Sequence, residues 1–134
     1  MRRIDHIGIA VEDLEAALVP YVEGLGLELE HIEEVPTERV RVAMLPVGET
    51  NIELLQPTDP ESAIAKFLER RGQGIHHVAL AVDDVEASIE ALRAAGVRLI
   101  DERPRPGAGG TRVAFVHPKG MGGVLLELVE GGHR

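Results

Sequence analysis

Two histidines and two glutamates occupy matched positions in this chain. His6 lies in IDHIGIAV and His77 in GIHHVALAV, while Glu53 in NIELL and Glu127 in VLLEL are each flanked by apolar residues. Neighbouring side chains of a strand point to opposite faces, so each carboxylate would leave the face that its neighbours bury. A carboxylate held away from water needs a compensating positive charge. The four residues therefore predict a site for a divalent metal ion.

The donor set narrows the choice of metal. Two imidazoles, two carboxylates and two water molecules would suit an octahedral ion, Co²⁺ first and then Mn²⁺ or Ni²⁺, although Zn²⁺ or Mg²⁺ could also accept such donors. The chain has no cysteine, which excludes thiolate and iron–sulfur sites. His31, His117 and His133 have no matched partner, and His76 aligns with Asp5, so we expect none of these four histidines to be a ligand.

An internal repeat explains the matched positions. IDHIGIAVEDLEAAL at 4–18 and IHHVALAVDDVEASI at 75–89 agree at seven of 15 positions, with a shift of 71 residues. RVAML and RVAFV are related by the same shift, and Glu53 then matches Glu127 after a short insertion. Three blocks in the same order indicate a duplicated unit of about 70 residues.

Each unit has the pattern of a strand, a helix and three further strands. Asp13 and Asp84 are expected to cap the helices, and Gly24, Gly26 and Gly96 to end them. In the first unit we expect a helix at 14–23 and strands at 6–11, 27–34, 39–46 and 50–56. In the second unit we expect a helix at 85–95 and strands at 77–82, 97–103, 111–117 and 124–129. A glycine-rich loop at 105–111 is expected between two of these strands.

The predicted fold class is α+β, with two tandem βαβββ modules that enclose a cleft. The modules span about 3–57 and 74–130, and a linker at 58–73 contains a helix near 62–71; together they form one domain, 1–134. In each last strand the carboxylate is expected to point away from the helix and into the cleft.

Charge and hydropathy limit the function classes. The formal net charge of −9 argues against a nucleic-acid or membrane surface, and no segment approaches 18 consecutive apolar residues, so we expect a cytosolic protein. Arg103, Arg105, Arg112 and Lys119 form a basic cluster in the last third of the chain. This cluster could meet an anionic small ligand or could be solvated surface.

The quoted segments resemble the vicinal oxygen chelate (glyoxalase/bleomycin resistance) superfamily, and within it the methylmalonyl-CoA epimerase family. The resemblance extends over about 3–129 and is most specific in RPGAGGTRVAFVHPKGMGGVLLEL. It implies the paired-module fold and a metal held by His6, Glu53, His77 and Glu127. It also implies a small acyl-CoA substrate, interconverted between its 2R and 2S forms, and a homodimer.

The chemistry implied by the resemblance is removal of the C2 proton, giving an enolate that a Lewis-acid cation stabilises. Several family members carry a glutamate, proposed as one base, where this chain has Val42. Our hypothesis is that Glu127 and its repeat mate Glu53 act as the two bases. For the CoA moiety, the residues expected to bind are Lys119, Arg112, Gly109 and Gly110; the alternative is that the glycines only form a flexible hairpin.

Two other functions compete with this prediction. A glyoxalase-I-like isomerase of thiol hemithioacetals would use the same metal ligands and a similar proton abstraction. A metal-free module that sequesters a small molecule would not need four matched ligands. A dioxygenase is disfavoured, because the resemblance implies two histidines and one glutamate from a single module for those enzymes.

Overall fold

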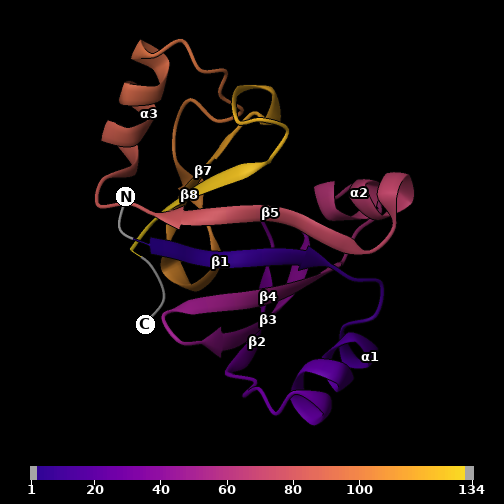
Figure 1. Cartoon of the computed structure of the whole chain (residues 1–134). Helices are drawn as coiled ribbons and strands as arrows, with labels where there is room; N and C mark the ends of the chain where they lie inside the picture. Colours follow the sequence, from indigo (N-terminus) through magenta and orange to yellow (C-terminus); the bar gives the residue numbers. More distant parts are fainter. Residues whose placement is uncertain (1–2, 132–134) are drawn as a thin grey trace. The chain divides into compact units, whose positions relative to one another are not determined.

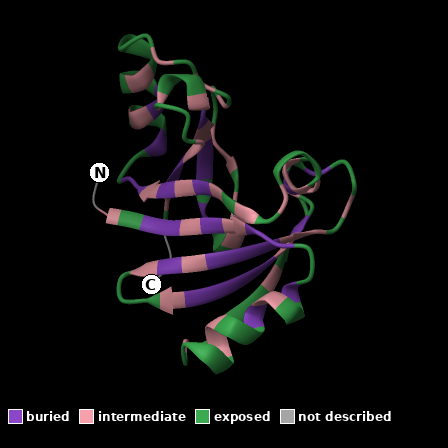
Figure 2. Cartoon of the chain, turned by 45° about the vertical axis from the view of Figure 1, so that its right-hand side comes forward, coloured by how far each residue is buried: buried purple, intermediate pink, exposed green. Residues whose placement is uncertain are grey.

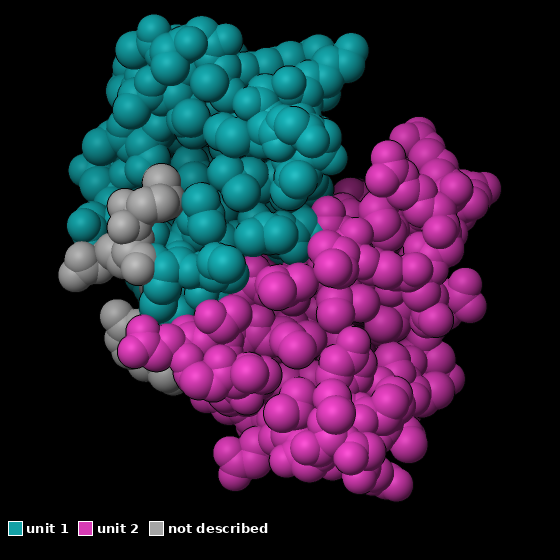
Figure 3. Space-filling view, in the orientation of Figure 1, with its two compact units in different colours: residues 1–5, 77–134 teal, residues 6–76 magenta. Residues whose placement is uncertain are grey.

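A computed structural model describes residues 3–131 and divides the chain into two compact units (Figures 1 and 3). Unit 2 is His6–His76, and unit 1 combines His77–Arg134 with the first five residues, so that β1 (Arg3–Ala10) and β5 (Gly74–Ala81) each cross the division. Within the described residues, no helix is long and apolar enough to cross a membrane.

Unit 2 contains the first strand–helix–strand pattern. Its strand order is β2-β3-β4-β1, with β4 parallel to β1 and antiparallel to β3. Its elements after β1 are α1 (Leu14–Val19), the π-helical turn η1 (Pro20–Gly24), β2 (His31–Val35), β3 (Val40–Val47), β4 (Thr50–Pro57) and α2 (Ala63–Arg71). The linker helix predicted near 62–71 is confirmed, and the Ser62 hydroxyl accepts the hydrogen bond that caps it.

Helix α1 is shorter than the predicted α-helix at 14–23. Pro20 has no N–H and its ring crowds the preceding turn, so the regular ladder cannot continue through it. The chain widens into a π-turn instead, in which the Leu25 amide donates to the Pro20 carbonyl at 3.0 Å. Gly26, with φ of 75°, then takes the left-handed conformation that lets the chain turn away.

Unit 1 repeats the pattern with strand order β5-β8-β7-β6, where β8 runs parallel to β5 and antiparallel to β7. Its elements after β5 are α3 (Val85–Ala94), β6 (Arg105–Pro106), η2 (Ala108–Gly110), β7 (Arg112–Val116), η3 (Pro118–Gly120) and β8 (Leu126–Glu130). The carboxylates of Asp13 and Asp84 accept amide hydrogens of the first turns of α1 and α3, which confirms both predicted caps.

The prediction of a strand at 97–103 is wrong, because this segment does not form a regular strand. Only Leu99 forms an isolated bridge, and the amides of Ile100 and Asp101 both donate to the carbonyl of Phe115. The Asp101 carboxylate takes the Phe115 amide at 2.8 Å, a bond that a backbone carbonyl would make in a regular ladder. A local side chain therefore replaces strand pairing here.

Each unit packs one sheet face against its helix. In unit 2 the buried core includes Leu14 and Leu18 of α1 with Leu54 of β4, and in unit 1 it includes Ile89 of α3 with Leu128 of β8. Figure 2 shows the same division, with buried residues along the strands and exposed residues on the outer sides of the helices. The opposite sheet face of each unit is left for the polar residues described next.

Candidate functional site

In unit 2, His6 and Glu53 meet on the sheet face opposite α1. Ile52 and Leu54 pack into the helix-side core, so alternation along β4 turns Glu53 to the other face, as predicted. The His6 Nδ1 atom lies 3.3 Å from the Glu53 Oε2 atom, and both side chains are about 95% buried. In the parallel register Glu53 lies opposite Gly8.

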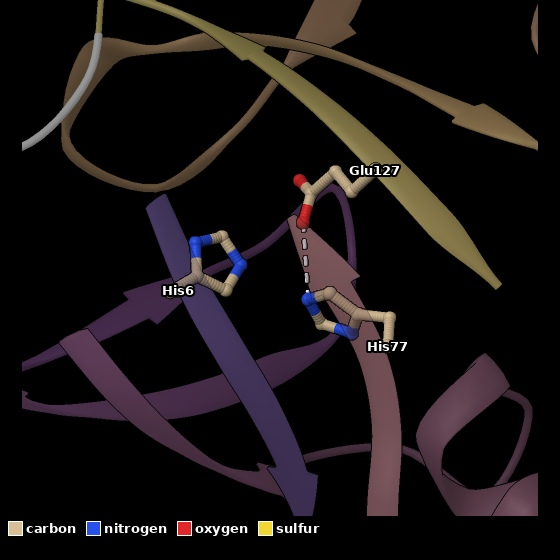
Figure 4. Close-up of side chains that lie close together, drawn as sticks. All are labelled: His6, His77 and Glu127. Atoms are coloured by element: carbon tan, nitrogen blue, oxygen red, sulfur yellow. Dashed lines mark ion pairs between the residues drawn. The ribbon is translucent and has the colours of Figure 1, made fainter. Parts of the chain in front are cut away.

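In unit 1, His77 and Glu127 form the equivalent pair. Leu126 and Leu128 belong to the core beneath α3, so Glu127 points to the opposite face. The His77 Nε2 atom lies 3.0 Å from the Glu127 Oε1 atom, and Figure 4 shows this ion pair, which joins β5 to β8. Ala79 lies opposite Glu127 in the register, as Gly8 does for Glu53, because the repeat preserves the position of each carboxylate.

Both pairs have the donor chemistry of a site for a divalent ion. Each offers one imidazole nitrogen and one carboxylate oxygen, and each is nearly closed to water. His77 and Glu127 are both members of one buried group of side chains that could hold a metal ion, and His6 and Glu53 are both members of another.

An aromatic ring flanks the pair of unit 1. Phe115 lies directly opposite Glu127 in the antiparallel register of β7 and β8. Its ring meets the imidazole of His77 edge to face, with centroids 5.7 Å apart and planes at 84°. Sequence reasoning missed Phe115, although its position one residue before the end of RVAFV would have placed it opposite Glu127 once the register of β7 and β8 was known.

Two further polar side chains were missed, and they tie the carboxylate-bearing strands to the helices. Gln56 Oε1 accepts the Leu14 amide at 2.7 Å, and Glu130 Oε1 accepts the Val85 amide at 2.9 Å. Gln56 follows Glu53 by three residues, and Glu130 follows Glu127 by three residues. Alignment of the two repeats could therefore have identified both acceptors.

The residues predicted to bind CoA lie around β7. Gly109 and Gly110 form the η2 turn with φ of 65° and 77°, a conformation that glycine favours. Lys119 is exposed in η3. Arg112 lies on the helix side of β7, where it pairs with Glu86 at 3.1 Å and with Glu130. The structure does not bring Arg112 to the face of β7 that adjoins Glu127.

The described histidines that are not expected to bind a metal lie outside the two histidine–glutamate pairs. His31 is exposed and pairs with Glu33, and the His76 ring packs edge-on against Phe67 of α2. His117 Nδ1 accepts the Lys119 amide at 3.0 Å and caps η3. His133 lies outside the described residues.

The His117 cap has an altered proton affinity. Partial burial, with the positive charges of Arg98 and Lys119, lowers the pKa of His117 from its ordinary value of 6.5. The ring is therefore held neutral, which is the form that can accept the Lys119 amide hydrogen.

The sequence of this chain is similar to that of a known protein family. The family model described as "Glyoxalase/Bleomycin resistance protein/Dioxygenase superfamily" matches residues 5–115. The "Ethylmalonyl-CoA/methylmalonyl-CoA epimerase" of Cereibacter sphaeroides is 41% identical over 128 residues, which cover 94% of this chain and 96% of that protein.

Solved structures agree with the sequence comparison. The methylmalonyl-CoA epimerase of Mycobacterium tuberculosis superposes with a TM-score of 0.92 at 44% identity, covering 98% of this chain and 89% of that one. A methylmalonyl-CoA epimerase in complex with methylmalonyl-CoA and NH4+ gives a TM-score of 0.93 at 42% identity, with 97% and 94% of the two chains covered. The βαβββ pattern of each unit is thus shared with proteins of one family.

Proposed function

The chain belongs to the glyoxalase/bleomycin resistance protein/dioxygenase superfamily and, within it, to the methylmalonyl-CoA epimerase family, and on this premise we propose that it interconverts (2R)- and (2S)-methylmalonyl-CoA. The observation that carries the proposal is the similarity of nearly the whole chain to an epimerase that was solved with methylmalonyl-CoA bound. The buried histidine–glutamate pair in each unit supports it, since these are the groups that such chemistry needs.

The proposed metal ligands are His6, Glu53, His77 and Glu127, holding one divalent cation, with Co²⁺ expected first. The donor set fits, because two neutral imidazoles and two carboxylates carry two negative charges, which balance a divalent ion. The matched position of each pair in the repeat supports a shared role. When bound, the cation supplies Lewis-acid polarisation of a substrate oxygen.

Glu127 and Glu53 are the proposed acid–base residues. The C2 proton is acidified by the adjoining thioester carbonyl, and inversion requires that a proton leave one face of C2 and return to the other. One carboxylate from each unit would meet this requirement. Val42 is 2% exposed on β3, and by alternation it shares the face of Met44, which lies opposite Glu53; its apolar side chain cannot take a proton there.

The substrate's CoA portion is proposed to contact Lys119, Gly109 and Gly110. Arg112, expected from the sequence to join them, is left out of the proposal because it pairs with Glu86 and Glu130 on the helix side of β7. Backbone N–H groups of a turn with left-handed glycines can point together at an anion. Lys119 supplies an exposed positive charge on the turn that follows β7. A cytoplasmic location and a homodimer stay predictions, and sedimentation of the purified protein would test the second.

An isotope-exchange assay tests the proposed function. The protein, stripped with a chelator and reloaded with Co²⁺, is incubated with (2S)-methylmalonyl-CoA in D₂O, and we expect deuterium at C2 and formation of the 2R epimer. E53Q and E127Q should each lower epimerisation by about 10²- to 10⁴-fold. E90Q, which changes an exposed glutamate of α3, is the matched control and should behave as wild type.

Three results would contradict parts of the proposal. If E53Q exchanges the C2 proton in both stereochemical senses at the native rate, Glu53 is not a base. Turnover of a thiol hemithioacetal but not of methylmalonyl-CoA would indicate a glyoxalase-I-like isomerase. Failure to bind any divalent ion, together with no turnover, would indicate a metal-free binding module.

A further inference from the structure

An arginine of unit 1 lies on the same sheet face as Glu127. Arg105 of β6 pairs in register with Val113 of β7, and Phe115, two residues further on, pairs with Glu127 of β8. Residues opposite one another, or two apart along a strand, share a face of the sheet. Arg105 therefore stands on the face that carries the histidine–glutamate pair.

The guanidinium of Arg105 is held from two sides. Its Nε atom lies 3.2 Å from the Asp101 carboxylate, which is itself fixed by accepting the Phe115 amide at 2.8 Å. Its Cζ atom lies 5.1 Å from the centroid of the Phe115 ring. Because the same ring contacts His77 edge to face, one aromatic side chain separates the arginine from the imidazole.

This arrangement suits the recognition of an oxyanion. A planar guanidinium that is already oriented loses little conformational freedom when it binds a carboxylate or phosphate. The Arg105 side chain is 37% exposed, so a ligand can reach it. Arg112 is 46% exposed, but it lies on the other face of β7, where it pairs with Glu86 and Glu130. Methylmalonyl-CoA carries both a carboxylate and phosphates.

The geometry points to Arg105 as an anion-recognition residue that binds an oxyanion of the thioester substrate beside His77 and Glu127. This inference rests on the proposed function and adds to it a contact that lies outside the predicted CoA-binding set. The competing explanation is an ion pair that serves only the loop at 101–105. Exposed ion pairs contribute little to stability, so that role would leave ligand binding unchanged when the charge is removed.

Binding measurements on the metal-loaded protein separate the two explanations. Calorimetric titration compares wild type, R105Q, R105K and the control R93Q. Arg93 is an arginine of the same unit with similar exposure, and it pairs with Glu90 on α3 and with Glu102 of the loop at 101–105. Three ligands are used: methylmalonyl-CoA, methylmalonyl-pantetheine, which lacks the nucleotide phosphates, and propionyl-CoA, which lacks the carboxylate. Circular dichroism confirms that each variant is folded.

We expect R105Q to weaken methylmalonyl-CoA binding by about tenfold or more, R105K to recover part of the loss, and R93Q to stay within about twofold of wild type. A loss that persists with methylmalonyl-pantetheine but not with propionyl-CoA assigns Arg105 to the carboxylate, and the reverse assigns it to a phosphate. Equal affinities for R105Q and R93Q with all three ligands would overturn the inference while wild-type turnover keeps the proposed function intact. If wild type binds none of them, the proposed function fails and the inference fails with it.

Discussion

The side-chain oxygen of Gln56 lies 2.7 Å from the amide nitrogen of Leu14 and accepts its hydrogen bond. Unit 1 repeats this relationship between Glu130 and Val85 at 2.9 Å. In both units the acceptor follows the site glutamate by three residues on the same strand, and the donor opens the helix. The first-turn amides have no partner inside the helix, so this bond satisfies one of them and also fixes the end of the strand.

Removing the Gln56 acceptor should destabilise unit 2. Q56L leaves the partly buried Leu14 amide without its partner, and we expect a loss of about 1–3 kcal/mol in the free energy of unfolding, measured in urea. Q56E keeps an acceptor and should stay close to wild type. Q73L removes the exposed acceptor of the Glu12 amide, which water can replace, and should cost less. Equal stability of Q56L and Q56E would refute the role of this bond.

Adding a methyl group at Gly107 should disturb the turn that contains Gly109 and Gly110. A Cβ atom there would lie 2.6 Å from both Thr111 Oγ1 and Val113 Cγ1, and Val113 is buried within β7. We expect G107A to lose about 1–3 kcal/mol of stability.

The matched control for this change is G74A, because its Cβ would meet nothing within 4 Å and its φ is not positive. G74A should change the free energy of unfolding by less than about 0.5 kcal/mol. Equal stability of G107A and G74A in thermal unfolding would show that the space around Gly107 does not limit the side chain there.

The matched polar residues could be predicted because the two halves of the repeat can be aligned with each other. A single Glu53 between Ile52 and Leu54 indicates only that its side chain leaves the helix face. Its repetition at Glu127, with a histidine on the first strand of each repeat, indicates that the four residues share one role. Both histidine–glutamate contacts could therefore be expected from the sequence.

The surroundings of these pairs could not be read in the same way. RVAFV has buried residues on both faces, Val113 on one and Ala114 and Val116 on the other. Alternation of apolar residues therefore does not reveal that Phe115 lies toward Glu127 while Arg112 lies toward α3. The stretch at 97–103 has the composition of a strand, but the Asp101 side chain takes the hydrogen bond that strand pairing would need. Such details depend on register and on tertiary contacts, which local patterns do not contain.

Stability should fall at mildly acidic pH because of His117. Burial, with Arg98 and Lys119, lowers the pKa of His117 in the folded protein below 6.5, so the unfolded chain binds the proton more tightly. The contribution of the neutral ring is therefore complete above about pH 6.5 and decreases as the pH falls through and below that value.

The variant H117N isolates this effect. Asparagine can cap the η3 turn through its side-chain oxygen but does not titrate, so its unfolding midpoint in urea should decline less between pH 7 and pH 5 than that of wild type. Identical pH profiles for wild type and H117N would show that His117 does not contribute to the acid sensitivity.

Binding of a divalent cation should raise the melting temperature through the buried histidines. A ligand that binds only the folded state at a concentration of 100 times its Kd adds about 2.7 kcal/mol, which corresponds to roughly 8 °C for a chain of this size. H77N removes one proposed donor and should abolish most of this shift with Co²⁺, measured by differential scanning calorimetry. H31N is a stringent control, because His31 also lies 3.3 Å from a glutamate, Glu33, but this pair is exposed to solvent. H31N should keep the full shift, and an equal response of H77N and wild type would exclude His77 as a ligand.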